Sequence, residues 1–389
     1  MSSTATPEGE TVDYTIKNSD VVTKYRTAAV IADAALVKVL DACVPGAKLI
    51  DLCSLGDRYI EEGTKTVYAK GSGANKISKG IAFPTCVSVN HVICHFSPLP
   101  SDPEAAEEIK EGDMVKVELG AQIDGFAAVT AHTIVVGATK EAPVTGKKAD
   151  VLKAAYLASE AALRLIREGK KNSDVTETVQ TITDAFGVKS IEGMLSHQQE
   201  RNLLDGKKTI ILNPSDQNRN YERCDFAVGD VWTIDVLVST GEAKPKDSAY
   251  RTTVHKKTST TYQLKMAASR KVYSEVTAKF GQFPFTLRAM EDERKARMGI
   301  QECAKRSVVD AYNVYTDQKG ESVAQFIFTV LLTANGPVRI TPSHWKDELV
   351  QSEHKVEDPE IVKLLNSGLG TKKNKKKKKA AAAQEADKQ

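Results

Sequence analysis

Two carboxylates stand at matching places in two short segments of the sequence. The segments "GDMVKVEL" at 112–119 and "GDVWTIDV" at 229–236 share one pattern, in which Glu118 and Asp235 each fill the seventh position. Carboxylates that strands present to a common cleft can bridge two divalent cations, as metal-dependent hydrolases require. The repeat indicates two similar strands in a duplicated α+β fold with a central cleft. The alternative is chance similarity between two strands that each follow a Gly-Asp turn.

The strand that follows Glu118 lacks the partner acid that such a site requires. Residues 112–136 alternate apolar positions around a turn that contains glycine, which predicts a β-hairpin. A hairpin that serves two adjacent cations should supply an acid from each strand, because the ions need bridging oxygens. Val129 stands eleven residues after Glu118 and offers no electron pair. The hairpin therefore argues against a complete dinuclear metal centre.

The overall composition is typical of a soluble globular protein, with 389 residues of which 41% are hydrophobic and 27% charged. No segment approaches the roughly 20 apolar residues that a membrane helix needs, and no apolar run follows the N-terminus. We therefore expect an intracellular protein without membrane insertion. The six cysteines form no CxxC pair and no zinc-finger spacing, which favours free thiols over disulfides or structural zinc.

Helical and strand patterns alternate along the chain and supply the elements that must position the two acids. Apolar residues recur at helical spacing in several segments, whereas β-rich segments are bounded by proline and glycine. We expect helices at 20–44, 49–65, 148–169 and 172–187, and a helical stretch from about 262 to 312. We expect strands within 80–100, 190–197, 208–214, 229–242 and 322–334, in addition to the hairpin.

One concentration of positive charge lies in the C-terminal tail. Residues 371–389 hold eight lysines against two acids, so the tail carries +6 and residues 1–370 about −3. Such a tail cannot bury apolar surface, and we interpret it as disordered. One hypothesis is a nuclear or nucleolar address and a phosphate-backbone anchor, and the alternative is a solvated tail. The anchoring residues are Lys372, Lys373, Lys375, Lys376, Lys377, Lys378 and Lys379.

A second concentration of positive charge lies in residues 244–271, where eight cations stand against the single acid Asp247. Interspersed tyrosine, serine and threonine suit an RNA backbone and exposed bases. The segment 287–299 adds further cations, but its own acids partly offset them, so a solvated charged face is the alternative there. The RNA-binding candidates are Lys244, Lys246, Arg251, Lys256, Lys257, Arg270, Lys271, Arg294, Lys295 and Arg297.

Several longer segments carry a resemblance to a known family. They include "GIAFPTCVSVN", "CHFSPL", "GFAAVTAHT", "IEGMLSHQ", "DVLVSTGEAKPKD" and "PFTLRAMEDERKARMG". From about residue 21 to 341 the chain resembles the proliferation-associated, ErbB-receptor-binding proteins, which share the pita-bread fold of type-2 methionine aminopeptidases. We therefore expect a pita-bread domain over residues 20–367 with a helical insert at 262–320. A disordered N-terminus at 1–19 and a disordered lysine tail at 368–389 should flank it.

The resemblance also places the metal ligands of active aminopeptidases, which are two Asp, one His and two Glu. The five positions are Glu118, Val129, His197, Asp235 and Ile327, and two substrate-contacting His positions fall at His95 and Asp205. Val129 and Ile327 cannot donate electron pairs, so the resemblance implies no metal, no cofactor and no catalysis. The remaining Glu118, His197 and Asp235 form either a single-ion site or, as we favour, a buried polar remnant. For His95 we favour a structural hydrogen-bonding role.

The function that the resemblance implies is association with RNA. It implies a non-catalytic protein that binds ribosomal RNA and the large ribosomal subunit, and acts in ribosome biogenesis, translation and growth control. Its expected location is cytoplasmic and nuclear, including the nucleolus. Other structured RNA, DNA and protein partners are alternatives. The rival functions are an active methionine aminopeptidase and a nuclear DNA-binding or transcriptional cofactor, since phosphate contacts alone do not separate DNA from RNA.

Overall fold

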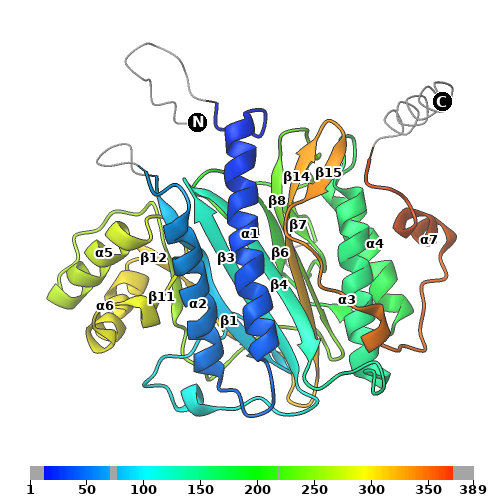
Figure 1. The fold of residues 1–389 in the computed structure, drawn as a ribbon, viewed down its shortest axis with the longest axis horizontal. Coiled ribbons are helices and arrows are strands. Elements are labelled where there is room, and N and C mark those ends of the chain that lie inside the picture. Colours follow the sequence, from blue (N-terminus) through cyan, green and yellow to red (C-terminus); the bar gives the residue numbers. More distant parts are fainter. Residues whose placement is uncertain (1–12, 71–76, 217–218, 371–389) are drawn as a thin grey trace, which may run out of the picture.

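The computed structural model describes residues 13–70, 77–216 and 219–370, which are built around one large antiparallel sheet (Figure 1). The hydrogen-bonded path runs through β1 (Lys79–Val89), β3 (Met114–Ile123), β4 (Phe126–Val135), β14 (Val323–Thr333), β8 (Val231–Ser239), β6 (Leu195–Gln199) and β7 (Thr209–Ile211). Two short strands extend it, because β15 (Gly336–Arg339) pairs with β14 and β5 (Lys189–Ser190) pairs with β8. The predicted hairpin and the two strands with matching acids, β3 and β8, are confirmed.

Four helices cover one face of this sheet (Figure 1). Helices α1 (Ser19–Ala42) and α2 (Leu49–Thr66) pack on β1, β3 and β4, whereas α3 (Gly146–Leu165) and α4 (Asn172–Ala185) pack on β14, β8 and β7. Each pair has its own buried apolar cluster against the sheet. The duplicated α+β architecture predicted from the sequence is therefore confirmed. None of the helices in the described ranges is both long and apolar enough to cross a membrane.

The two halves of the sheet meet at a seam between β4 and β14, where threonine hydroxyls replace most of the backbone ladder. The hydroxyl of Thr329 donates to the carbonyl of Val129 and accepts from its N–H, at 3.0 Å in both cases. The hydroxyl of Thr133 does the same for Gln325, at 2.7 and 2.8 Å. Ile327 and Ala131 are paired midway between these two exchanges. The seam is therefore two-fold symmetric in its hydrogen bonding, as the duplicated halves lead one to expect.

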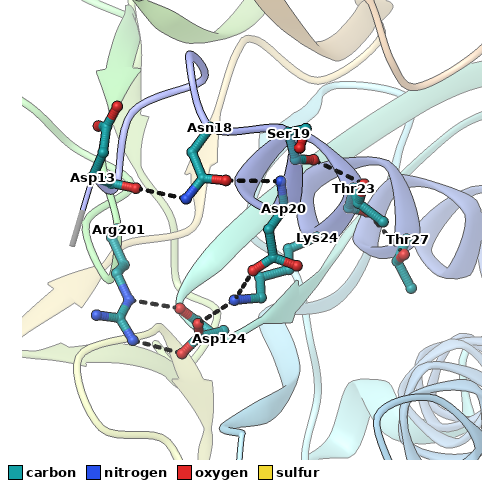
Figure 2. A network of polar contacts seen from close by, with 9 residues as sticks. All are labelled: Asp13, Asn18, Ser19, Asp20, Thr23, Lys24, Thr27, Asp124 and Arg201. Atoms are coloured by element: carbon teal, nitrogen blue, oxygen red, sulfur yellow. Dashed lines mark hydrogen bonds and ion pairs between the residues drawn. The ribbon is translucent and has the colours of Figure 1, made fainter.

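The turn between β3 and β4 ties the first half of the sheet to a loop of the second. Asp124 and Gly125 both have positive φ, 57° and 82°, as a two-residue hairpin turn of this kind requires. The Asp124 carboxylate forms ion pairs with Lys24 of α1 at 2.8 Å and with Arg201 at 2.5 Å (Figure 2). Arg201 also donates to the Asp124 carbonyl and lies 4.2 Å from the ring centroid of Tyr14. This network fixes the loop after β6, which carries Asp205.

The insert lies beside β1 at one edge of the sheet (Figure 1). It contains the three-stranded sheet β11 (Phe285–Thr286), β10 (Val254–Lys257) and β12 (Val309–Tyr312), with helices α5 (Ala267–Lys279) and α6 (Glu293–Lys305). The prediction of a helical insert at 262–320 is therefore wrong in its bounds and in part of its content. The insert begins with β10, and its paired strands are only two to four residues long, which gives little periodic signal.

A buried ion pair attaches the insert to the body of the protein. The guanidinium of Arg288 contacts the Asp57 carboxylate of α2 at 2.5 Å and donates to Ser97 and to the carbonyl of Pro98. Asp57 also accepts the backbone N–H of Thr85 on β1 at 2.7 Å. Because the side chains of Arg288 and Asp57 are only 10% and 14% exposed, this contact holds the insert in one orientation.

A second small sheet and the C-terminal segment complete the described chain. The sheet contains β2 (Val92–Cys94), β13 (Tyr315–Thr316) and β9 (Lys246–Asp247). The short helices are η2 (Pro103–Ala106), η3 (Leu287–Ala289), η4 (Asp347–Leu349) and α7 (Pro359–Leu365).

The structured part of the chain extends beyond the predicted bounds at both ends. Residues 13–18 precede α1, where Asn18 caps the helix by accepting the N–H of Asp20 (Figure 2). At the other end, Arg167 donates to the carbonyls of Gly368 and Leu369 at 2.7 and 3.0 Å. Residues 13–19 and 368–370 therefore correct the predicted disordered termini. The remainder of those two segments lies outside the described residues.

The threonine seam yields a stability prediction. Thr329→Val keeps the side-chain shape but leaves the N–H and C=O of Val129 without their partner. Because each buried backbone group without a partner costs about 1–3 kcal/mol, we expect the free energy of unfolding, measured by urea denaturation, to fall by about 2–6 kcal/mol. Thr277→Val, on the exposed side of α5, is the matched control and should cost about 0.5 kcal/mol or less. Equal losses for the two variants would contradict the role of the seam.

Candidate functional site

The sheet face opposite the four helices carries a cavity of about 270 Å³ that contains all seven positions expected from the resemblance. Strands deliver five of them, and loops deliver the other two. The strand residues are Glu118 on β3, Val129 on β4, His197 on β6, Asp235 on β8 and Ile327 on β14. The loop residues are His95, directly after β2, and Asp205, after β6. The structure thus brings together residues that are up to 232 positions apart in the sequence, from His95 to Ile327.

The floor of this cavity is hydrocarbon. Val129 and Ile327 are 3% and 2% exposed and belong to one apolar cluster with Phe83 and Val254. Phe83 reaches the cavity because β1 bulges there, next to Pro84, which has no N–H to give to the ladder. No group of three or more His, Cys, Asp or Glu side chains within the described ranges is arranged to hold a metal ion. The donor set therefore does not fit the dinuclear centre of active relatives.

Two of the three carboxyl groups of the cavity, Glu118 and Asp235, have raised pKa values. Burial raises the pKa of Asp235 from its usual 3.8 to about 7, although Gln325 opposes the shift by donating at 3.1 and 3.3 Å. Burial, and the charge of Asp235, raise the pKa of Glu118 well above its usual value. A carboxyl group that favours its neutral form is a poor metal ligand, because binding must first release the proton.

The two histidines of the cavity are neutral bases in different surroundings. Burial lowers the pKa of His95 to about 4, and its Nδ1 lies 3.1 Å from the carbonyl of Asn313, so Nδ1 donates. Its ring packs edge-on against Tyr312, with centroids 5.2 Å apart, and its backbone has φ of 64°. Burial also lowers the pKa of His197, whose Nδ1 has no hydrogen-bond partner in the described chain. His95 thus has a hydrogen bond and an aromatic contact within the protein, and its structural role stays a prediction.

Lys256 lies at the cavity rather than on the outer surface. It forms an ion pair with Asp205, and its side chain is 13% exposed. Strand alternation places Lys256 on the same face of β10 as Val254, which is buried in the floor cluster. Its interpretation as an exposed RNA contact is therefore corrected. The period-two spacing from Val254 was the signal that could have revealed this orientation.

The remaining RNA-binding candidates lie on different elements of the structure. Lys244 and Lys246 lie at β9, in the small sheet, whereas Lys257, Arg270 and Lys271 lie on the insert. Four candidates are paired with acids, which leaves less free positive charge than the sequence indicates. The pairs are Arg251 with Asp102 at 2.7 Å, Lys271 with Glu291 at 3.7 Å, Lys295 with Asp292 at 2.9 Å and Arg297 with Glu293 at 3.9 Å. Arg294 is exposed on α6, and the seven tail lysines lie outside the described residues.

Sequence reasoning missed several residues that shape the cavity. Phe83, Met194, Leu204 and Tyr312 line it, and of these only Leu204 is adjacent in sequence to an acid of the cavity, Asp205. Tyr312 packs edge-on to Phe83 at 5.4 Å, which makes an aromatic corner together with His95. No motif in the sequence marks Tyr312, because it reaches the cavity only through the pairing of β12 with β10.

Two α+β halves that share one sheet around a central cavity define the pita-bread class of proteins. A family model described as "Metallopeptidase family M24" matches residues 23–253. The chain is 46% identical over 366 residues to "Curved DNA-binding protein" of Schizosaccharomyces pombe, with 94% of each chain covered. It is 44% identical over 381 residues to "ERBB-3 BINDING PROTEIN 1" of Arabidopsis thaliana, covering 97% of this chain and 93% of that one.

A solved structure of a thermophilic Arx1 is also similar, with a TM-score of 0.85 and 37% identity over 91% of this chain and all of that one. The chain belongs to metallopeptidase family M24, among its ErbB-3-binding and proliferation-associated proteins. The family and the fold inferred from the sequence are therefore confirmed.

The raised pKa of Asp235 predicts a pH-dependent effect of Asp235→Asn. The native protein keeps this proton up to about pH 7, whereas the unfolded chain releases it near 3.8. The stability due to the protonated group is thus full below pH 3.8 and is lost as pH rises through 7. Since asparagine stays neutral, the variant's free energy of unfolding, relative to that of the wild type, should rise by about 2–4 kcal/mol between pH 4 and pH 8.

Urea unfolding at several pH values between these limits measures the gain. Asp184→Asn, at an exposed position of α4, is the control and should show a difference from the wild type that is constant with pH. A loss of stability in Asp235→Asn that grows with pH would contradict the sign of the shift.

Proposed function

We propose that this protein is a non-catalytic member of its family that binds RNA and the large ribosomal subunit. The observation that carries the non-catalytic part is the hydrocarbon floor of the cavity, where Val129 and Ile327 replace two ligands. The flanking Glu118 and Asp235 favour their neutral forms, which weakens them as ligands further. Function then resides on the outer surface.

RNA binding is best supported by one end of the insert, which we name the insert edge. It comprises residues 257–270 and 305–306, and its cations are Lys257, Lys265, Arg270, Lys305 and Arg306. The guanidinium of Arg306 lies 4.8 Å from the ring centroid of Tyr262, and Lys257 lies 5.2 Å from that of Tyr273. Cations beside tyrosine rings suit a phosphate backbone with exposed bases.

Glu302 of α6, an acid beside the insert edge, is bound by backbone groups of the protein itself. The Glu302 carboxylate accepts the backbone N–H groups of Lys265 and Met266 at 2.9 and 3.0 Å. It therefore braces the N-terminus of α5, and hydrogen bonds to these two backbone groups use its oxygens. Within the described residues, no cation of the insert edge forms an ion pair with an acid, in contrast to the paired Lys271, Lys295 and Arg297.

The related proteins support a nucleic-acid function in general terms. The relative of Schizosaccharomyces pombe has a name that describes binding to curved DNA. DNA binding, with a nuclear or transcriptional role, is therefore the second candidate function. We also propose a cytoplasmic and nuclear, including nucleolar, location, with roles in ribosome biogenesis, translation and growth control.

The non-catalytic proposal predicts the outcome of a peptidase assay. We expect no release of methionine from a Met-Ala-Ser peptide, with or without added Co²⁺ or Mn²⁺, because the floor cannot bridge two ions. Mass-spectrometric metal analysis of the purified protein should find less than one bound transition-metal ion per chain. Two tightly held ions, with turnover that His197→Ala abolishes, would overturn the proposal.

The RNA-binding proposal predicts a selective effect of charge reversal at the insert edge. We expect Lys265→Glu/Lys305→Glu/Arg306→Glu to lower the slope of log K against log salt by about 2 for single-stranded RNA, since each lost phosphate contact contributes about 0.7. The variant should also fail to co-sediment with large ribosomal subunits. Filter binding over a salt series and sucrose-cushion sedimentation of the full chain measure the two effects.

A variant with the same charge change on the helical face is the control. Lys38→Glu/Lys147→Glu/Lys189→Glu alters exposed positions far from the insert and should retain ribosome association. Deleting residues 371–389 should weaken binding to all polyanions alike while preserving ribosome selectivity, because a phosphate anchor carries no shape information. Equal losses in the insert-edge and helical-face variants would contradict this assignment. Competition by curved duplex DNA that exceeds competition by RNA would favour the DNA alternative.

A further inference from the structure

A second cavity lies on the helical face of the sheet, and we name it the helix-side cavity. It has a volume of about 250 Å³ and is bordered by the chain segment 340–350, which runs between α1 and α3 (Figure 1). In this segment, Nε2 of His344 lies 2.6 Å from Oδ1 of Asp33 on α1. The next residue, Trp345, stacks on Tyr156 of α3 with ring centroids 4.3 Å apart. The segment is therefore attached to both halves of the protein.

His132 of β4 is buried in the wall of the helix-side cavity. Its neighbour Ala131 belongs to the apolar cluster at the floor of the central cavity, so strand alternation turns His132 to the opposite face. The side chain is only 7% exposed, and its ring packs edge-on against Phe326 with centroids 5.2 Å apart. Neither ring nitrogen has a hydrogen-bond partner among the described residues. Because buried polar groups without partners are costly, the cavity suits a ligand with one polar group at this point.

Most of the remaining lining is aliphatic. It includes Val37, Leu40, Val135, Val144, Leu152 and Leu349, which come from both halves of the protein and from the segment between α1 and α3. Pockets that hold drug-sized molecules have volumes of about 300–1,000 Å³, so a ligand of this smaller cavity must itself be small. A short hydrocarbon body with a single polar group fits these surroundings.

The charges around His132 select the polar group. Burial, and then the charges of His344, Arg339 and Lys346, lower the pKa of His132 to about 3. His132 is therefore a neutral donor in a region where cations predominate, and such a region favours an anion. An anion can accept the ring N–H without the proton transfer that a cationic ligand's competition for this site would require.

Lys346 is the cation of the lining that is available to such an anion. Arg339 and His344 already contact acids, Glu160 and Asp33. The acids that follow Lys346 in the chain are also paired, Asp347 with Lys153 and Glu348 with Lys140. Lys346 itself is exposed and has no partner among the described residues.

One acid opposes an anion in the described lining. It is Asp41, which lies at an exposed position in the last turn of α1. Solvent and salt screen a charge at such a position, and Asp41 is not among the groups that shift the pKa of His132. The buried end of the cavity therefore keeps its preference for negative charge.

We propose that the helix-side cavity binds a small aliphatic carboxylate, whose oxygens accept from His132 and face Lys346 and whose hydrocarbon chain packs on the aliphatic lining. The site lies on the opposite face of the sheet from the central cavity. It is also separate from the insert edge, so it does not depend on the RNA-binding proposal.

A ligand series on the unsubstituted full-length protein tests the proposal first. Calorimetry at pH 7.5 and constant ionic strength would compare 4-methylpentanoate, acetate, 4-methyl-1-pentanol and 4-methylpentylammonium. We expect 4-methylpentanoate to bind with a dissociation constant of about 1 mM, an affinity within reach of a ligand of this size. The other three should each bind at least about fivefold more weakly, because each lacks either the chain or the negative charge.

Tryptophan fluorescence gives an independent readout of the place of binding. The chain has two tryptophans, and Trp345 lines the helix-side cavity. The other, Trp232, is fully buried and packs edge-on against Phe226 in the core of the second half. We therefore expect 4-methylpentanoate to change the emission of Trp345, and Trp345→Phe should abolish the change.

Three variants then test the two polar contacts. His132→Phe keeps a ring of similar shape without the N–H, and we expect it to weaken 4-methylpentanoate at least about tenfold. Lys346→Gln should weaken the carboxylate about threefold, as an exposed charge allows, and leave the affinity for 4-methyl-1-pentanol unchanged. Lys189→Gln, at an exposed position of β5, is the matched control and should leave both affinities unchanged. If His132→Phe does not fold, the comparison of the two lysine variants still decides.

Three results would overturn the proposal. If 4-methyl-1-pentanol or the ammonium binds as tightly as 4-methylpentanoate, the cavity does not select a carboxylate. Equal carboxylate affinities in Lys346→Gln and Lys189→Gln would place the anion elsewhere. The absence of any binding by 4-methylpentanoate at about 20 mM would show that water alone satisfies His132.

Discussion

The exchange of hydrogen bonds between Thr133, Thr329 and the facing backbone is the interaction on which the rest of this structure depends. The seam joins two hairpin-and-helix halves into one sheet, and among the main sheet strands β4 and β14 share a single ladder pair. Without the two hydroxyls, the N–H and C=O groups of Val129 and Gln325 would be buried without partners. The seam also fixes the backbone at Val129 and beside Ile327, and so it sets the floor of the cavity.

That floor changes the electrostatics of the whole cavity. In a metal-bound relative of this fold, ions would offset the charge of clustered carboxylates. Here Val129 and Ile327 gain from burial, at about 2 kcal/mol for each side chain of this size, and they leave Glu118 and Asp235 in surroundings of low polarity. The raised pKa values follow from this exchange of ligands for hydrocarbon.

The sequence predicted the parts of the molecule that depend on local pattern. Helical spacing located α1, α2, α3 and α4 to within a few residues, and the repeated Gly-Asp pattern correctly placed Glu118 and Asp235 in one cavity. It did not predict features that depend on contacts between distant segments. The hydrogen bonds of Thr133 and Thr329 join residues that are 192 and 200 positions apart. Nothing in the sequence distinguishes these two threonines from other threonines in strands.

The same limit explains the errors at the surface. Lys256 belongs to a basic segment, and its charge alone suggested exposure, but Asp205 lies 51 positions earlier in a loop that the Asp124 network holds at the cavity. Likewise, Glu291 of the segment before α6 offsets Lys271 of α5 only after the insert has folded. Net charge along a sequence therefore overstates the free charge on a folded surface, by the number of ion pairs that tertiary structure creates.

The attachment of the insert decides whether its cationic edge can recognise a shaped partner. Arg288 and Asp57 form a buried ion pair. Arg288 also donates hydrogen bonds to Ser97 and to the carbonyl of Pro98, and Asp57 accepts one from the backbone of β1. Removing one member of such a pair leaves an uncompensated buried charge, which costs about 3–5 kcal/mol, so the insert has little freedom to reorient. Cations held in fixed positions can match the spacing of phosphates on a folded RNA, whereas charge without fixed geometry attracts any polyanion. Selectivity for a structured partner therefore follows from the buried arginine at the base of the insert as much as from the exposed cations at its edge.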